Sequence, residues 1–192
     1  MLVIREAETP DLARCLEVRP SYTTSATWQV VLEGDPTRRS TYARGEAFLP
    51  FQLRQTRLPR PCQLTLPALA VPLAEAWPHY HLRLVALDLL DASGTSLLLG
   101  YLLLNLFFDQ GQAQIARLLV APESRGHGVG KALVTAARHW AQKRNLIALL
   151  AHAPGRNVPG IEFYQQRGFR ISGFLEHFYP TREDALFLMC QL

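Results

Sequence analysis

The chain has 192 residues, 48% hydrophobic and 19% charged, a composition that supports a buried core and argues against intrinsic disorder. We expect one domain over residues 1–192, because no linker divides the sequence. The formal charge of +4 favours an anionic partner, without distinguishing a nucleic acid from a phosphorylated cofactor. The longest apolar run, Leu97–Phe108, is too short for a transmembrane helix, and the N-terminus lacks signal-peptide features. We therefore expect a cytoplasmic protein with no membrane partner.

The N-terminal part of the chain predicts a strand, a helix and a β-hairpin. Leu2–Arg5 has strand character, and Thr9-Pro10-Asp11 combines a capping residue with a proline in the first helical turn. Two further segments, Trp28–Leu32 and Phe48–Arg57, have the alternating pattern of strands, and turn-forming residues lie between them. We interpret them as a hairpin that leaves the main body of the protein.

The middle of the chain predicts an antiparallel meander. Prolines punctuate residues 50–78 and indicate an extended connection. Three strands follow, at Leu82–Leu90, Ser96–Phe108 and Gln112–Val120. The turn signals Asp91–Gly94 and Asp109-Gln110-Gly111 connect these strands tightly. A third turn signal, Gly34-Asp35-Pro36, belongs to the preceding hairpin.

The C-terminal part alternates helices and strands. Apolar residues at helical spacing follow a glycine-rich loop and predict a helix from Val129 to beyond Trp140. Leu146–His152 is a short apolar strand, Val158–Arg167 a helix and Ala185–Gln191 a terminal strand. These elements together predict an α/β fold with a mixed sheet.

The loop between the meander and the helix predicts a phosphate site. Val120–Lys131 runs from a strand through Gly126, Gly128 and Gly130 into a helix. Glycines let backbone N–H groups converge on an oxyanion, the helix N-terminus adds about half a positive charge, and two cationic side chains are available. The residues that we expect to contact the anion are Arg125, Gly126, His127, Gly128, Val129, Gly130 and Lys131.

This loop differs from the common nucleotide-binding motifs. The preceding strand belongs to an antiparallel meander, no acidic residue stands where a dinucleotide ribose would need one, and Lys131 is followed by neither Ser nor Thr. The sequence instead resembles the GNAT superfamily of N-acetyltransferases, whose signature is an Arg-Gly-x-Gly-x-Gly loop. The resemblance covers about residues 82–192. It implies the GNAT fold, a mixed and mostly antiparallel sheet with flanking helices, and acetyl-CoA as co-substrate.

A second block extends the resemblance. Asn157 stands seven residues before Tyr164, which stands four residues before Gly168-Phe169. In the family such an asparagine touches the cofactor and such a tyrosine protonates the departing thiolate, although a core tyrosine would give the same pattern. The family also binds pantetheine where the strand before the loop carries a bulge and separates from the next strand. The resemblance therefore adds backbone contacts from Leu118, Leu119 and Val120, the last two as stabilisers of the oxyanion.

The general base is left open by the sequence. Many family members carry a glutamate on the strand before the loop, but Gln112–Leu118 contains no carboxylate. A water relay is one alternative, and the candidate side chains from neighbouring segments are Glu33, Asp88, Asp109, Glu176 and Tyr179. Neither the histidines nor Cys15, Cys62 and Cys190 show metal-ligand spacing, so we expect no metal site.

The acceptor is less well specified than the cofactor. The tail from His177 to Leu188 resembles those of streptothricin-type antibiotic acetyltransferases and of ribosomal-protein N-terminal acetyltransferases. The hairpin at 28–57 favours the first subgroup, because the second has a helical region there. We expect a small-molecule primary amine and no nucleic-acid partner. Protein N-terminal or lysine acetylation and a catalytically silent acetyl-CoA-binding module are the alternatives.

The hairpin is expected to project over the acceptor side and to select the amine. Tyr22, Trp28 and Glu33 could hold a cationic amine by cation–π and charge contacts. Burial in a homodimer interface would explain the apolar residues Phe48 and Phe51 equally well.

Overall fold

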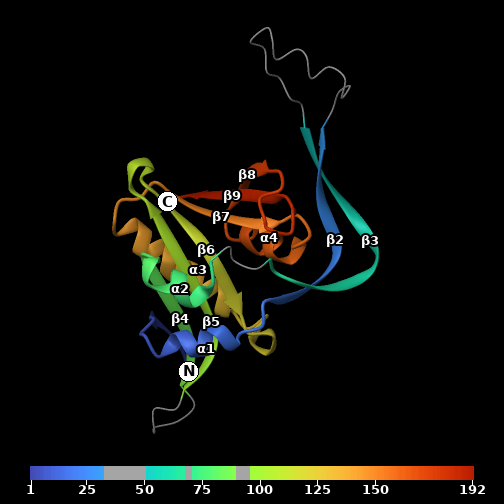
Figure 1. Cartoon of the computed structure of the whole chain (residues 1–192). Coiled ribbons are helices and arrows are strands. Elements are labelled where there is room, and N and C mark those ends of the chain that lie inside the picture. Colours follow the sequence, from blue (N-terminus) through green and yellow to red (C-terminus); the bar gives the residue numbers. More distant parts are fainter. Residues whose placement is uncertain (33–50, 68–70, 90–95) are drawn as a thin grey trace.

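The structure is a computed structural model that describes residues 1–32, 51–67, 71–89 and 96–192 (Figure 1). Within these residues a seven-stranded sheet has the order β1-β4-β5-β6-β7-β9-β8. Its strands are β1 (Leu2–Glu6), β4 (Leu82–Leu89), β5 (Ser96–Phe107), β6 (Gln112–Val120), β7 (Ala148–Pro154), β8 (Arg170–Leu175) and β9 (Ala185–Gln191). All neighbouring pairs are antiparallel except β6 with β7. The sheet is thus mixed and mostly antiparallel, as predicted.

Helices cover both faces of the sheet. They are α1 (Asp11–Glu17), α2 (Leu73–Ala76), α3 (Val129–Gln142) and α4 (Val158–Gln165), with short 3-10 turns η2 (Trp77–His79), η3 (Phe108–Gln110) and η4 (Pro122–Ser124). One core cluster joins α3 and α4 to residues such as Leu84 and Leu102. The other packs α1, α2 and η2 against Val85 and Leu103. Since neighbouring strand residues point to opposite faces, these clusters lie on the two sides of the sheet.

The meander ends in a bulge and a separation of strands. The β5–β6 register shifts between the pairs Leu103↔Arg117 and Leu104↔Ile115, which leaves Ala116 as the extra residue on β6. The β6–β7 pairing runs only from Gln112↔Ala148 to Ile115↔Ala151. Beyond Ile115, β6 pairs with β5 alone, and its other edge is free of β7.

The hairpin is longer than predicted. The strands β2 (Ser21–Leu32) and β3 (Phe51–Thr65) form a separate two-stranded antiparallel sheet, which lies beside α4 in Figure 1 and packs Trp28, Val30 and Leu53 against the core. The predicted bounds of 28–57 were therefore too narrow. Pro59 and Pro61, interpreted as part of a connection, lie within β3, at the register shift between Thr24↔Cys62 and Ala26↔Arg57. A bulge tolerates proline because the ladder hydrogen bonds are already interrupted there.

Some predicted elements differ from the structure, and other predictions concern residues that the structure does not describe. Neither β8 nor α2 was predicted, and β7 lies two residues later in the chain than predicted. The predicted turns at 34–36 and 91–94, and the side chains of Phe48, Phe51 and Glu33, lie outside what the structure describes. That the whole chain forms one domain stays a prediction.

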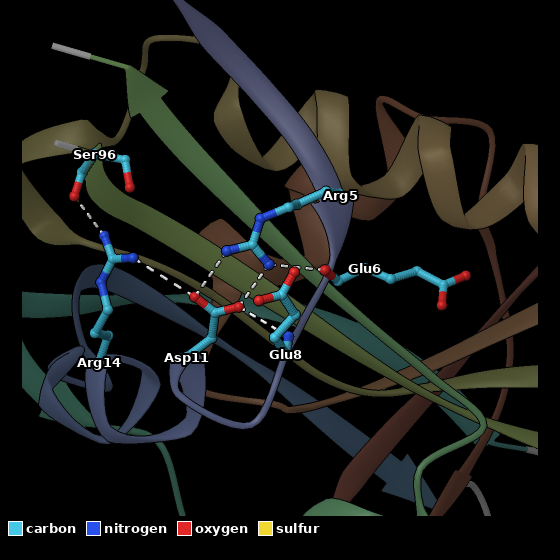
Figure 2. A network of polar contacts seen from close by, with 6 residues as sticks. All are labelled: Arg5, Glu6, Glu8, Asp11, Arg14 and Ser96. Atoms are coloured by element: carbon cyan, nitrogen blue, oxygen red, sulfur yellow. Dashed lines mark hydrogen bonds and ion pairs between the residues drawn. The ribbon is translucent and has the colours of Figure 1, made fainter. Parts of the chain in front are cut away.

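A buried carboxylate fixes α1 to β1. Asp11, with 3% of its side chain exposed, accepts hydrogen bonds from Arg5 at 2.6 and 3.1 Å and from the N–H of Glu8 at 2.9 Å (Figure 2). Arg14 approaches the same carboxylate to 3.5 Å and donates to the Ser96 carbonyl at 2.6 Å. Burial alone would raise the pKa of Asp11, but the hydrogen bonds and charges of the two arginines outweigh it and lower the pKa.

Candidate active site

A cavity of about 890 Å³ opens where β6 separates from β7. Its walls come from the C-terminal half of β6, the glycine-rich loop, the start of α3, α4, the end of β7 and the tail after β8. The lining residues predicted from the sequence are Leu118, Leu119, Val120, Arg125, Gly126, Gly128, Val129, Gly130, Lys131, Asn157 and Tyr164. Of the predicted contacts, His127 does not line the cavity and is exposed.

Two glycines shape the loop ahead of α3. Gly126 and Gly128 have φ of 79° and 84°, in the left-handed region that side chains rarely adopt. A Cβ on either would meet nothing within 4 Å, so the space beside the loop is open. Gly128 caps α3, and the first helical bond runs from Ala132 N–H to its carbonyl at 3.0 Å. The N–H groups that precede Ala132 in α3 thus have no intrahelical acceptor and are available to an anion.

Cations flank these free donors. Arg125 donates through Nε to the Val120 carbonyl at 3.1 Å, which holds its side chain across the loop. Burial lowers the pKa of Arg125, with a smaller opposing effect of Glu123, but the group stays charged at neutral pH. Lys131 is exposed on the first turn of α3. Open space, helix-terminal donors and two cations fit the pyrophosphate of a nucleotide-like co-substrate.

The free edge of β6 offers backbone donors to the cavity. Ala121 N–H donates to the Leu99 carbonyl at 2.8 Å. Because donors alternate in an antiparallel ladder, Leu119 N–H is directed to β5 and the N–H groups of Leu118 and Val120 to the opposite side. Of the two expected oxyanion donors, Val120 therefore faces the separation from β7 and Leu119 faces β5.

Asn157 lies at the start of α4, and Tyr164 lies one residue before its end. Asn157 is the N-cap, and its Oδ1 accepts a hydrogen bond from Gly160 N–H at 3.1 Å. Tyr164 is buried, with its ring packed against Phe163 and Phe169 at centroid distances of 5.3 and 5.2 Å. No hydrogen bond to its hydroxyl forms within the described residues. Burial raises the pKa of Tyr164, so the hydroxyl keeps its proton at neutral pH.

The candidates for the general base differ in whether they line the cavity. Tyr179 lines the cavity, whereas Asp88, Asp109 and Glu176 do not. Glu33 lies outside the described residues. The Tyr179 hydroxyl and His152 Nδ1 form a 2.8 Å hydrogen bond, and His152 also lines the cavity.

His152 is a site residue that sequence reasoning missed. It is the one polar side chain within the apolar strand β7, five residues before Asn157. This interruption was the available signal, because a polar residue inside a buried strand needs a partner that the sequence does not name. Burial lowers the pKa of His152 and raises that of Tyr179, whose neighbours Tyr164, Glu183 and Tyr22 add to the shift.

The base of the hairpin also forms part of the cavity wall. Ser21, Tyr22 and Thr23 line the cavity, as do Leu66 and Pro67. Trp28 does not line it, contrary to expectation. Its backbone N–H instead donates to the Gly155 carbonyl at 2.9 Å, and a Cβ on Gly155 would approach the Trp28 carbonyl oxygen to 2.6 Å. Trp28 therefore anchors the hairpin to the end of β7.

The described part of the chain has no group of three His, Cys, Asp or Glu side chains that could hold a metal ion. No helix in the same residues is long and apolar enough to cross a membrane.

Comparison with known proteins agrees with this geometry. Residues 54–169 match the model of the acetyltransferase (GNAT) family, which is more than half of the chain. The protein therefore belongs to this family. A streptothricin acetyltransferase from Escherichia coli is 32% identical over 73 residues, which are 38% of this chain and 42% of that protein. The matched stretch thus spans less than half of that relative.

Solved structures extend the likeness to the whole fold. A nourseothricin acetyltransferase superposes with a TM-score of 0.77 at 24% identity, over 99% of this chain and 98% of the other. A streptothricin acetyltransferase homologue from Bacillus anthracis, solved in complex with acetyl coenzyme A, gives 0.74 at 22% identity, over 100% and 99%. At these identities the similarity establishes the GNAT fold.

Proposed function

We propose that the protein transfers the acetyl group of acetyl-CoA to a primary amine of a small molecule by direct attack of the amine on the thioester. One observation carries this proposal. The glycine-rich loop, the free edge of β6 and the unpartnered hydroxyl of Tyr164 line one cavity. They supply in one place a pyrophosphate site, backbone donors and a proton donor.

Each group has a chemical task in this scheme. The α3 N-terminus, Arg125 and Lys131 bind the pyrophosphate. The N–H groups of Val120 and Leu118 donate to pantetheine or to the carbonyl oxygen that becomes negatively charged during attack. Tyr164, protonated at neutral pH, gives its proton to the departing thiolate.

The proton of the attacking amine goes to the pair of Tyr179 and His152. Since burial lowers the pKa of His152, its ring is neutral at pH 7 and can accept a proton. In the tautomer protonated on Nε2, Tyr179 donates to Nδ1 and can take the amine proton as it passes its own to the ring.

A small-molecule acceptor is favoured by the sequence relative and by the hairpin. The Escherichia coli relative is named for the antibiotic streptothricin, and Tyr22 at the base of the hairpin, with Pro67 just after it, lines the cavity.

The test is release of free thiol from acetyl-CoA with a panel of small amines, run beside peptides with free N-termini or lysines. We expect turnover with small amines. Turnover with peptides alone would overturn the acceptor class, and acetyl-CoA binding without turnover would indicate a silent binding module.

A further inference from the structure

We propose that the acceptor amine also carries a carboxylate and that Arg117 binds it. This inference rests on the proposed function and adds the substrate class. It concerns a cationic side chain at the acceptor end of the cavity that no protein group neutralises within the described residues.

Arg117 sits where β6 opens. It follows the bulge at Ala116 and lies two residues beyond the last β6–β7 pair, Ile115↔Ala151. It is half-buried and lines the cavity. Its Nε is fully buried and has no hydrogen-bond partner among the residues that the structure describes. A charged group without an acceptor in a partly buried wall is costly to the free protein, so a ligand that offers an acceptor to the accessible terminal N–H groups of Arg117 binds there favourably.

The side chain faces away from the phosphate loop. Arg117 pairs with Leu103 across β5 and β6, and paired residues point to the same face. Leu103 belongs to the core cluster beneath α1, α2 and η2, whereas α3 covers the other face. The positive charge of Arg117 also opposes the rise in pKa that burial causes in Tyr80 and Tyr101. Tyr101 belongs to the Leu103 cluster, and Tyr80 packs against it. The guanidinium therefore lies across the sheet from the pyrophosphate site.

The other cationic side chains of the cavity wall each have a protein contact or lie on the phosphate loop. Arg125 is bound to the Val120 carbonyl. Arg167 donates through Nη1 to the Phe163 carbonyl at 2.6 Å and stacks 3.6 Å from the Phe163 ring centroid, although its Nε, like that of Arg117, is buried without a hydrogen-bond partner in the described residues. Lys131 lies on the loop that takes the pyrophosphate. Arg117 is left, and among the described lining residues there is neither Asp nor Glu to pair with it.

These surroundings select the acceptor. A polycationic amine would be repelled by an unpaired guanidinium in a partly desolvated wall. A carboxylate matches the planar guanidinium with two parallel hydrogen bonds, and the neutral phenol of Tyr80 can donate a further one. An α-amino acid or a related amino carboxylate has the required pair of groups.

The experiment compares α-amino acids with their α-amino amides as acceptors. The kcat/KM of each acid and amide is measured by thiol release for the wild type, Arg117→Gln, Arg117→Lys and the exposed, cavity-remote control Arg170→Gln. The acid-to-amide ratio in a variant, divided by that in the wild type, cancels differences in amine basicity. We expect Arg117→Gln to lower this ratio by about 10- to 100-fold, as charge-assisted hydrogen bonds do. Arg117→Lys should retain part of it, and Arg170→Gln all of it.

The outcomes separate the two proposals. Turnover with an unchanged ratio in Arg117→Gln and Arg117→Lys would overturn this inference and leave the acetyltransferase proposal standing. Absence of thiol release with every amine would overturn both. Should Arg117→Gln fail to fold, judged by its thermal melt, Arg117→Lys keeps the charge but loses the planar fork and decides the question by the same ratio.

Discussion

The Nδ1 atom of His152 lies 2.8 Å from the hydroxyl of Tyr179, so that a strand residue and a residue of the C-terminal tail meet at the cavity. The His152 ring also packs against Phe178 at 4.9 Å and Phe187 at 5.8 Å between centroids. These aromatic neighbours contribute to the burial of the ring, and burial moves the pKa of His152 below its ordinary 6.5.

The His152–Tyr179 pair predicts a pH dependence. Since the folded pKa of His152 lies below 6.5, the ring is neutral above that value and becomes protonated as the pH falls through the lowered pKa. The kcat/KM should therefore be flat near pH 7 and fall at acid pH. His152→Gln and Tyr179→Phe should each lower kcat/KM by about 10²- to 10⁴-fold, and the glutamine variant should lose the acid limb. A full pH profile with one amine checks this.

His139, an exposed residue on α3, provides the control. His139→Gln should keep the wild-type profile. An acid limb that persists in His152→Gln would assign the titration to another group.

Loss of the Tyr164 hydroxyl should affect the chemical step. Tyr164→Phe should lower kcat by about 10- to 10⁴-fold with nearly unchanged acetyl-CoA affinity, because a general acid acts on the leaving group and contributes in this range. Tyr101→Phe, in the core beneath α1, is the matched control and should retain kcat. Equal kcat in the two variants would return Tyr164 to a purely structural role. Steady-state kinetics with a calorimetric Kd for CoA measures both quantities.

Charge at Gly128 should abolish cofactor binding. Any side chain there strains a backbone with φ of 84°, so Gly128→Glu and Gly128→Gln carry the same strain at nearly the same volume. The glutamate adds a negative charge beside the free donors of α3 and should remove measurable CoA binding, whereas the glutamine should weaken it less. Calorimetric titration with CoA distinguishes them. Equal affinities would argue against a pyrophosphate over this loop.

The Asp11 network predicts a stability effect remote from the cavity. Asp11→Asn loses charge-assisted hydrogen bonds to Arg5 and should reduce the free energy of unfolding by about 2 kcal/mol at pH 7. Because the folded pKa of Asp11 lies below 3.8, its contribution is present above that value and is lost as the pH falls through the folded pKa. The difference between variant and wild type in urea should thus shrink below about pH 4. The exposed Asp109→Asn should show no such difference.

The base of the hairpin should influence the acceptor and spare the cofactor. Tyr22 is buried in the cavity wall, where burial raises its pKa to about 12. Tyr22→Ala should raise the KM for the amine several-fold at constant Kd for CoA. Trp28→Ala should act through stability, because Trp28 anchors the hairpin at Gly155 without lining the cavity. This division would be contradicted if Trp28→Ala changed the amine selectivity and Tyr22→Ala left it unchanged.

Much of the fold could be predicted because local rules decide it. The bounds of β6 and β9 were predicted to the residue, since apolar segments bounded by polar or turn-forming residues mark both strands. β8 was missed because Arg170–Leu175 contains a glycine and a serine and pairs only with β9 at the edge of the sheet. Pro59 and Pro61 misled the prediction for β3, because the bulge that accommodates them depends on the partner strand.

The site was partly predictable for a related reason. The glycine-rich loop and the Asn157–Tyr164 spacing are local in sequence, so a motif could indicate them. The partnership of His152 with Tyr179 joins residues 27 positions apart through the β7–β9 pairing and the tail between β8 and β9. The same applies to Arg117, whose missing partner becomes evident only when the surrounding strands are in place.

The division of the cavity walls between two sheets has an evolutionary consequence. The seven-stranded sheet and the segments that connect its strands provide the loop, the free edge of β6 and Tyr164 on α4, while another part of the cavity wall is the base of a separate two-stranded sheet. Substitutions in β2 and β3 leave the strand pairing of the seven-stranded sheet, and with it the backbone N–H donors of β6, unchanged. A lineage can therefore change the part of the acceptor that contacts the hairpin by drift in β2 and β3, while it keeps Arg117 and its reaction chemistry.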